Sequence, residues 1–245
     1  MSNFKKLEEN TFFVSVTKDG ELAFDNVEVD IAETELPEDL ELTEYQYYIQ
    51  KVGFYLVNTV AWCKQLDLAI NLLSNFDYSK QGALRSEHLI YNIENYLIRI
   101  KSVHDRVLQL VNAVFHLCIN EASVNHGVII SNYKVQHRRE IHKAIKAISK
   151  FLSSHEQIRH TLIHRHSLLD KELKKIEMMY ANNFEHISDQ EEVKKYKSIR
   201  SELLKRYVTQ KKSEFRSIND TLYGLINDLL ISLEPEYERQ KRIVG

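Results

Sequence analysis

The sequence SEHLIYNIENYLIRIKSVHDRVLQLVNAVFHLCIN, residues 86–120, decides the fold class. Its apolar residues recur every three, four or seven positions, which is the spacing of one face of an α-helix. These residues are Ile93, Leu97, Ile100, Val103, Val107, Leu110, Val114 and Leu117. So long a stripe predicts a helix of many turns that buries one side in a helical bundle.

The same periodicity continues on both sides of this segment. It predicts a helix over residues 41–75, one over 138–152, one from a Ser153–Glu156 capping box to about residue 184, and one from Ser188 or Asp189 to Pro235. The polar run 209–214 is expected to bend the last helix, and residues 120–136 are expected to form a long connection. Only six Gly and two Pro occur, too few for the turns of a many-stranded sheet.

The first forty residues have a different pattern. Apolar runs at 11–16 and 22–24 flank the turn signal Lys18-Asp19-Gly20, and Val27, Val29 and Ile31 then alternate. This pattern predicts a small β-hairpin appendage over residues 1–40. The expected architecture is therefore all-α, a four- to five-helix bundle in one domain over residues 41–245, with that appendage leaning on it.

Composition excludes several classes of protein. Hydrophobic residues make up 43% of the chain and charged residues 28%, an ordinary soluble mixture. No segment approaches the roughly 18 apolar residues of a membrane span, so we expect a cytoplasmic protein with no membrane partner. Cys63 and Cys118 have apolar neighbours, which favours two reduced thiols over a disulfide or a cysteine-based zinc site. No glycine-rich loop for a nucleotide phosphate is present.

Charge is distributed unevenly although the net charge is only −2. Residues 1–50 hold three Lys and thirteen acidic residues, a balance of −10. Residues 134–175 hold eleven Lys or Arg and four acids, and residues 194–216 hold nine Lys or Arg and two acids, a balance of +7 in each. Two basic segments of this kind would attract a polyanion such as RNA.

The first basic segment contains Arg159-His160-Thr161-Leu162-Ile163-His164. An always-charged guanidinium can hold a phosphate, and an imidazole that titrates near neutrality can move a proton, so this pair could cleave RNA without a metal. A separation of five residues places the two side chains about 140° apart on a helix. They do not share a face, so two motifs would have to meet across a symmetry axis.

A second pair, Arg99 and His104, has the same spacing. It lies in the middle of a strongly apolar helix, and Ile100 stands where a polar residue is expected. There we expect Arg99 to pair with an acid of its own helix, and His104 to be a hydrogen-bonded histidine of the bundle.

The segment Ile158–Arg165 resembles the signature of the HEPN superfamily (higher eukaryotes and prokaryotes nucleotide-binding), in its prokaryotic R-x4-H form. That signature is an Arg, a polar residue, a short spacer and a His at the start of a late helix in an α-bundle. Residues 96–99, with Asp105 and Arg106, also look like the long middle helix of some prokaryotic members. The resemblance covers about residues 41–185 and implies a homodimer in which the two motifs face each other.

For active members the resemblance also implies metal-independent RNA cleavage without a cofactor. His164 would then transfer the proton, Arg159 would hold the scissile phosphate, and His160 would assist. The supporting acid would be Glu94 or Asp105. The expected RNA contacts are Arg138, Arg139, His142 and Arg165.

Other interpretations of these residues stay open. His160 and His164 could bind zinc from one helix face, but no His-Glu-x-x-His pattern accompanies them, and we expect no metal. The protein could act as a toxin or in phage defence, with a cognate antitoxin or operon partner. It could instead be a non-catalytic helical dimer that binds RNA or a partner protein. In that case Arg159 and His164 would only hold a polar dimer interface together.

Overall fold

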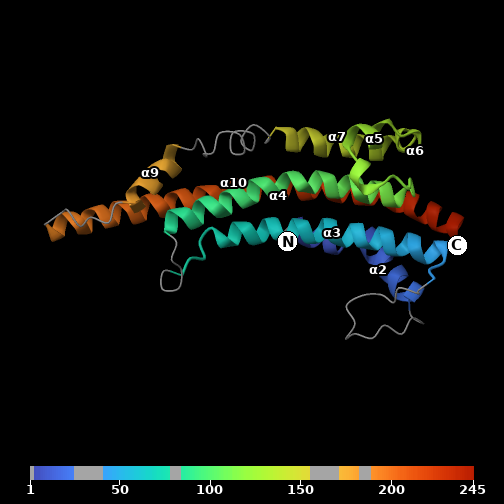
Figure 1. The fold of residues 1–245 in the computed structure, drawn as a ribbon, viewed down its shortest axis with the longest axis horizontal. Helices are drawn as coiled ribbons and strands as arrows, with labels where there is room; N and C mark the ends of the chain where they lie inside the picture. Colours follow the sequence, from blue (N-terminus) through green and yellow to red (C-terminus); the bar gives the residue numbers. More distant parts are fainter. Residues whose placement is uncertain (1–2, 25–40, 78–83, 155–170, 182–188) are drawn as a thin grey trace. The chain divides into compact units, whose positions relative to one another are not determined.

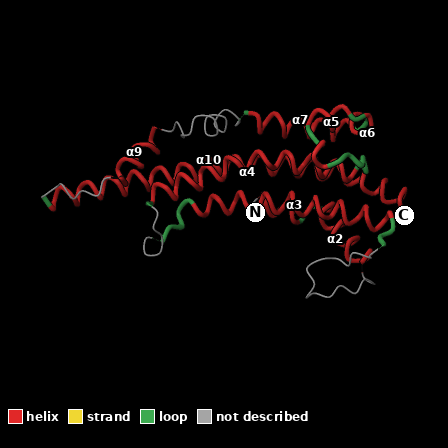
Figure 2. The backbone as a smooth tube through the Cα atoms, viewed as in Figure 1, coloured by secondary structure: helices red, strands yellow, loops and turns green. Residues whose placement is uncertain are grey.

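The computed structural model describes residues 3–24, 41–77, 84–154, 171–181 and 189–245 (Figure 1). These residues form helices and their connections, and no strand occurs among them (Figure 2). The all-α prediction is therefore confirmed.

The β-hairpin predicted for the N-terminus is wrong. Residues Asn3–Glu8 form α1 and Thr11–Phe24 form α2. Phe12 and Val16, four positions apart, are both buried, which is the spacing of a helix face. Asn10 precedes α2 and accepts a hydrogen bond from the Phe12 amide, as a helix cap does. The alternating residues Val27, Val29 and Ile31 lie outside the described residues.

Two long helices form where they were expected, α3 over Glu44–Leu72 and α4 over Arg85–Val114. The second ends six residues earlier than the periodicity predicted. The Leu117 amide bonds to the Asn112 carbonyl and the His116 amide to the Ala113 carbonyl, with His116 in the left-handed region at φ 45°. This is a Schellman ending, with histidine in the place usually taken by glycine.

The expected connection after α4 contains three short helices, η1 (Glu121–Ser123), α5 (His126–Ser131) and α6 (Tyr133–Gln136). Helix α7 (Arg139–Ser153) follows as predicted. Ser153 is the last residue of α7, and Glu156 lies outside the described residues. The described part of the next segment is α9 (Lys171–Ala181).

The last helix, α10, runs over Gln190–Val244. It begins as predicted, because the Asp189 carboxylate accepts a hydrogen bond from the Glu191 amide. It does not stop at Pro235, and it is helical throughout 209–214. Buried Leu233, Glu236 and Tyr237 flank the proline. Their packing and hydrogen bonds offset the backbone bond that a proline inside a helix removes.

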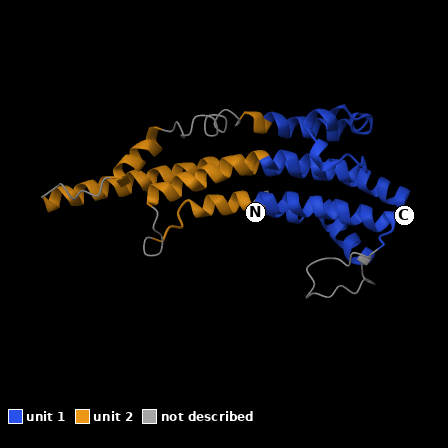
Figure 3. Ribbon diagram, in the orientation of Figure 1, with its two compact units in different colours: residues 1–63, 102–150, 222–245 blue, residues 64–101, 151–221 orange. Residues whose placement is uncertain are grey.

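The contacts divide the chain into two compact units (Figure 3). Unit 1 comprises residues 1–63, 102–150 and 222–245. Its helices are joined through buried aromatic residues of α2, α3 and α10. The Tyr48 ring stacks on that of Tyr237 with centroids 5.8 Å apart, and Phe12 meets Tyr237 edge-on at 5.4 Å. The Tyr48 hydroxyl donates to the Val114 carbonyl at the end of α4.

Unit 2 comprises residues 64–101 and 151–221. Its centre is the Tyr96 ring of α4, which stacks on Phe215 of α10 with centroids 3.8 Å apart. The Tyr96 hydroxyl donates to the Asn219 side chain at 2.8 Å, and Asn219 donates to Asp67 at 2.7 Å. In this series of hydrogen bonds, the Tyr96 hydroxyl and the Asn219 side chain therefore each have a partner.

Candidate functional site

The turn between α6 and α7 places three nitrogen-bearing side chains in a row, His137, Arg138 and Arg139. The His137 amide bonds to the Tyr133 carbonyl, and the Arg138 amide to the Val135 carbonyl, which closes α6. The Arg138 carbonyl then accepts from the His142 amide, which opens α7. The chain therefore turns on these residues, and all three are exposed.

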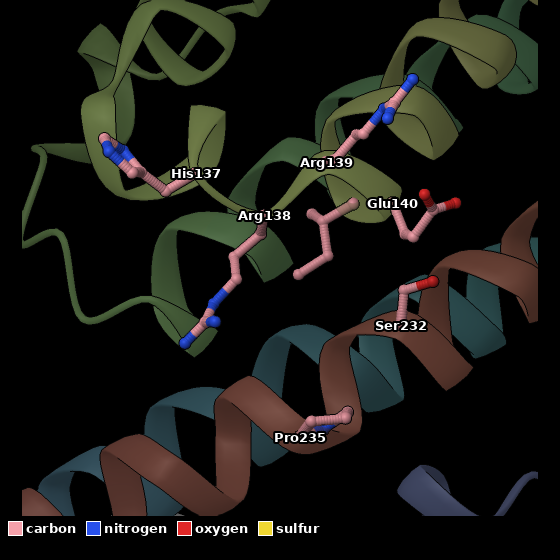
Figure 4. A pocket seen from close by; sticks show the side chains of 7 residues that line it. His137, Arg138, Arg139, Glu140, Ser232 and Pro235 are labelled. Atoms are coloured by element: carbon pink, nitrogen blue, oxygen red, sulfur yellow. The ribbon is translucent and has the colours of Figure 1, made fainter.

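These residues border a pocket of about 350 Å³ in unit 1 (Figure 4). It is lined by His137, Arg138, Arg139, Glu140, Ile141, Ser232 and Pro235. Pro235 has no N–H to offer the Ile231 carbonyl, so an acceptor of α10 lacks its usual partner beside the pocket. The lining combines apolar surface with two arginines, a hydroxyl and the carboxylate of Glu140, which is paired with Lys143 at 3.1 Å. The two arginines favour a ligand with an anionic group and a flat apolar part.

The two arginines of the turn differ in what they contact. In Figure 4 their side chains leave the turn in different directions. The Arg138 Nε donates to the Glu236 carboxylate at 2.8 Å, and the Glu236 side chain is only 1% exposed. No ion pair involves Arg139 among the described residues, so its guanidinium is available to a ligand.

Glu236 is a buried carboxylate with three donors. Arg239 and Gln240, one turn further along α10, donate to it together with Arg138. Burial raises the pKa of Glu236, but the hydrogen bonds from these three residues outweigh burial and hold its pKa below the ordinary value. Arg138 therefore fastens the turn to α10, and less of its hydrogen-bonding capacity is left for a ligand.

His142, a predicted RNA contact, does not line this pocket. It lies half-buried on α7, and its charge is felt by His126 of α5, whose pKa is lowered by burial first and then by Lys146 and His142. Of the three predicted contacts that the structure describes, Arg138 and Arg139 border the pocket, and His142 acts instead on α5.

The predicted catalytic residues Arg159, His160 and His164, and the predicted contact Arg165, lie outside the described residues. The zinc interpretation of His160 and His164 concerns the same segment. Elsewhere in the described part of the chain, no three potential metal ligands are grouped to hold an ion.

The two candidate acids, both on α4, have different surroundings. Glu94, in unit 2, is half-buried, and burial raises its pKa. Asp105, in unit 1, is exposed. Arg99, the first residue of the second Arg–His pair, donates to the side chains of Asn95 and Gln65. His104, the other member, forms a hydrogen bond with His126, which agrees with the expectation of a bonded histidine.

Another pocket in the described part of unit 1, of about 640 Å³, is lined by Tyr47, Lys51, Cys118, Ile119, Asn120, Glu121 and Ala122. Its one lysine, Lys51, donates to the Tyr47 hydroxyl, and its carboxylate, Glu121, accepts a hydrogen bond from Tyr55. Each pocket has one carboxylate in its lining, but the pocket beside Arg139 has two arginines and this one has a single lysine, so this pocket is less suited to an anion.

Sequence reasoning missed the contribution of α10 to the first pocket. The sequence predicts that the last helix stops at Pro235, so Glu236 and the residues after it are not expected to be helical. The signal for a buried carboxylate was present in the spacing, because Arg239 and Gln240 follow Glu236 by three and four positions and so share its helix face.

Comparison with known proteins identifies a family. The family model of the Cthe2314-like HEPN proteins matches residues 54–222, which include the Arg159–His164 motif. No curated protein and no solved structure matches the chain. Among the described helices, none is long and apolar enough to cross a membrane.

Proposed function

The chain belongs to the HEPN superfamily as a Cthe2314-like member, and from that premise we propose that it is a metal-independent endoribonuclease. The site is composite, formed where the Arg159–His164 motifs of two copies meet in a homodimer. The observation that carries this proposal is the position of the motif within the span that the family model matches.

The proposed reaction is attack of an RNA 2′-hydroxyl on the adjacent phosphodiester. His164 takes the proton of the hydroxyl or delivers one to the leaving 5′-oxygen, and an ordinary imidazole pKa of about 6.5 suits both tasks. Arg159 binds the phosphate and offsets the charge that develops on it, and His160 orients the reactants. The products are a 2′,3′-cyclic phosphate and a 5′-hydroxyl, and no cofactor takes part.

We assign RNA binding to the basic segment 134–175, with Arg139, His142 and Arg165 as contacts and Arg138 in a mixed role. Arg139 supports the assignment best, because it is exposed, borders the pocket and has no ion pair among the described residues. A nucleotide could place its base against Ile141 and Pro235 and its phosphate near Arg139.

Glu94 and Asp105 are both proposed as the supporting acid. The half-buried Glu94, whose pKa is raised by burial, suits proton donation better than the exposed Asp105. Replacing each by its amide separates them, because only the true supporting acid should shift the pH profile of cleavage.

The test is cleavage of mixed RNA by the full chain in EDTA. We expect the wild type to produce cyclic-phosphate ends and His164→Ala to be inactive. His166→Ala, two positions away in the same basic segment, is the matched control and should stay active. Activity that requires an added metal, or that survives in His164→Ala, would refute the proposal.

The alternative function is a non-catalytic helical dimer that binds RNA or a partner protein, such as an antitoxin encoded in the same operon. The use of Arg138 to hold Glu236 favours it, because a basic residue expected to face RNA here serves the fold. A chain that dimerises and binds RNA but leaves it intact, in wild type and His164→Ala alike, would support this alternative. A role as a toxin or in phage defence depends on the cleavage result.

A further inference from the structure

Two histidines from separate helices of unit 1 face each other. His104 lies on α4 and His126 is the first residue of α5. The Nε2 atom of His104 is 3.3 Å from the Nδ1 atom of His126, the ring centres are 5.2 Å apart, and the ring planes are inclined by 36°. Both side chains are half-buried, so solvent and small ions can reach them.

These two distances can be compared with those of a metal site. An ion bound tetrahedrally at about 2.0–2.1 Å from each nitrogen holds the two nitrogens about 3.3–3.4 Å apart. Each imidazole centre lies about 1.15 Å behind its nitrogen, so two rings that point at one ion have centres about 5.2 Å apart. Both separations agree with those observed in the structure.

A straight hydrogen bond between the same nitrogens would give a different geometry. With the nitrogens 3.3 Å apart, two rings aligned on an N–H···N axis would have centres about 5.6 Å apart. The observed 5.2 Å means that the rings are bent away from this axis. A bent arrangement weakens a hydrogen bond but is what two ligands of one ion require.

We propose that His104 and His126 form a two-histidine clamp for a late divalent transition-metal ion, of which Zn²⁺ is the probe we choose. The Nε2 of His104 and the Nδ1 of His126 are the ligand atoms, and water occupies the other positions. Imidazole nitrogen is a preferred ligand for Zn²⁺, Ni²⁺ and Cu²⁺ and a poor one for Mg²⁺ or Ca²⁺. The hydrogen bond between the two rings places a proton on one of the facing nitrogens. When the ion binds, that ring carries its proton on its other nitrogen instead, so binding to the neutral pair needs no net proton loss.

The fold holds both ligands in place before an ion arrives. The Asn125 side chain accepts a hydrogen bond from the Val128 amide and so fixes the start of α5, next to His126. Ile129, one turn further, is fully buried and anchors this short helix. On α4, His104 lies between the buried Val103 and Val107. Little conformational entropy is therefore lost when an ion joins the two rings.

Electrostatics sets the expected strength of the site. Burial first, and then the charges of Lys146 and His142 on α7, lower the pKa of His126. The positive charge of Lys146 also opposes a bound cation. His142 adds a third imidazole on α7, although the described residues contain no preformed group of three ligands. The clamp is therefore expected to be weaker than a closed four-ligand zinc site.

The consequence for the protein is structural. An ion held by both histidines ties α5 to α4, so Zn²⁺ should stabilise the folded chain in proportion to its concentration above the dissociation constant. This inference does not depend on the proposed function, because the expected RNA cleavage proceeds in EDTA.

The test is calorimetric titration of the EDTA-treated, dialysed full chain with Zn²⁺. We expect His104→Gln and His126→Gln each to lose one binding event of the wild type, or to weaken it at least about tenfold. His137→Gln, an exposed histidine of the same unit, is the matched control and should bind like the wild type. Lys146→Gln should tighten Zn²⁺ binding, because it removes a positive charge near the ion. If the histidine variants lost binding only because they disturb the fold, Lys146→Gln would not be expected to tighten it.

Two further measurements keep the result decisive. Circular dichroism melting in EDTA shows whether the variants are folded, and Zn²⁺ should raise the melting temperature of the wild type but not of His104→Gln. In the wild type, Zn²⁺ should protect His104 and His126 from modification by diethylpyrocarbonate. If the wild type binds no Zn²⁺, or if both variants bind it with unchanged stoichiometry and affinity, the clamp does not exist and any bound metal belongs to other histidines.

Discussion

The guanidinium of Arg138, in the turn before α7, donates to the carboxylate of Glu236 on α10 at 2.8 Å, and the Glu236 side chain is almost completely buried. The adjacent Arg139 has no such partner among the described residues. Two arginines that are adjacent in the sequence therefore have different structural roles. Arg138 joins two elements of the fold, and Arg139 borders the pocket with its side chain directed away from Arg138 (Figure 4).

We predict that this difference appears in stability. Arg138→Ala should lower the free energy of unfolding by about 1–2 kcal/mol, because it removes a charge-assisted hydrogen bond to a buried carboxylate that Arg239 and Gln240 still hold. Arg139→Ala should change it by less than about 0.5 kcal/mol, as is usual for an exposed residue. Urea unfolding of the two variants measures both. Equal losses would contradict the assignment.

For RNA binding, Arg139→Ala should have a larger effect than Arg138→Ala, the reverse of their order in stability. Arg139→Ala should weaken binding and reduce the slope of log affinity against log salt by about 0.7, the contribution of one single-strand phosphate contact. Arg138→Ala, tested where it is fully folded, should change the slope less. Fluorescence titrations of a single-stranded RNA at several salt concentrations give the two slopes, and a larger change for Arg138 would reverse the roles.

Glu236 should make stability depend on acid pH. Its pKa is lower in the folded protein than the ordinary value of 4.5, so its contribution to stability is complete above pH 4.5 and is lost as the pH falls through the folded-state pKa. Glu236→Gln lacks this titration. The stability difference between wild type and Glu236→Gln should therefore shrink steadily from pH 5 down to the acid limit of folding. Urea unfolding across that range measures it, and a constant difference would rule out the ionised buried carboxylate.

His126 should make the stability of the protein depend on pH in a second range, closer to neutral pH. Its pKa is lowered by burial and by Lys146 and His142, so between the folded-state value and the ordinary value of 6.5 the unfolded chain binds more protons. Stability is then lost as the pH falls from 6.5 through the folded-state pKa. Thermal melting in EDTA should show a shallower decline for His126→Gln than for wild type. The exposed His137→Gln provides the control, and identical declines in all three would exclude this titration.

The helices that sequence analysis located well are those whose packing repeats the pattern of the chain. In α4 every residue of the predicted apolar stripe from Ile93 to Val114 is buried, so the spacing of apolar residues was enough to locate this helix. The end of α4 was placed too late because its Schellman turn uses His116 rather than glycine, so no residue signals it. Helix α10 continues through Pro235 because contacts from Arg138 and α2, distant in sequence, outweigh a local breaker.

The candidate site was predictable only in part, for the same reason. The basic segment and its arginines could be read directly from the charges. Which of the two arginines stays available to a ligand depends on which one pairs with Glu236. Glu236 is almost a hundred residues away, and a single sequence gives no sign of its pairing with Arg138. The meeting of His104 with His126 likewise depends on how α5 folds back onto α4.

The N-terminal correction gives a test of register. In a β-strand Phe12 and Val14 would share one face, whereas in α2 the buried pair is Phe12 and Val16, and Val14 is 40% exposed. Val16→Ala should therefore lower the free energy of unfolding by about 1.5–3 kcal/mol, and Phe12→Ala by about 3–5 kcal/mol, since its ring also meets Tyr237. Val14→Ala should cost less than about 0.5 kcal/mol.

Urea unfolding of these three variants decides between helix and strand without any assay of function. The valine pair is the sharper comparison, because both changes remove the same atoms from residues only two positions apart. A large loss of unfolding free energy for Val14→Ala, with little loss for Val16→Ala, would contradict the helix and favour a β-strand in this segment. The predicted order instead requires α2 to be packed against α10, where the Tyr237 hydroxyl and the Lys241 amine both donate to Asp19 at 2.7 Å.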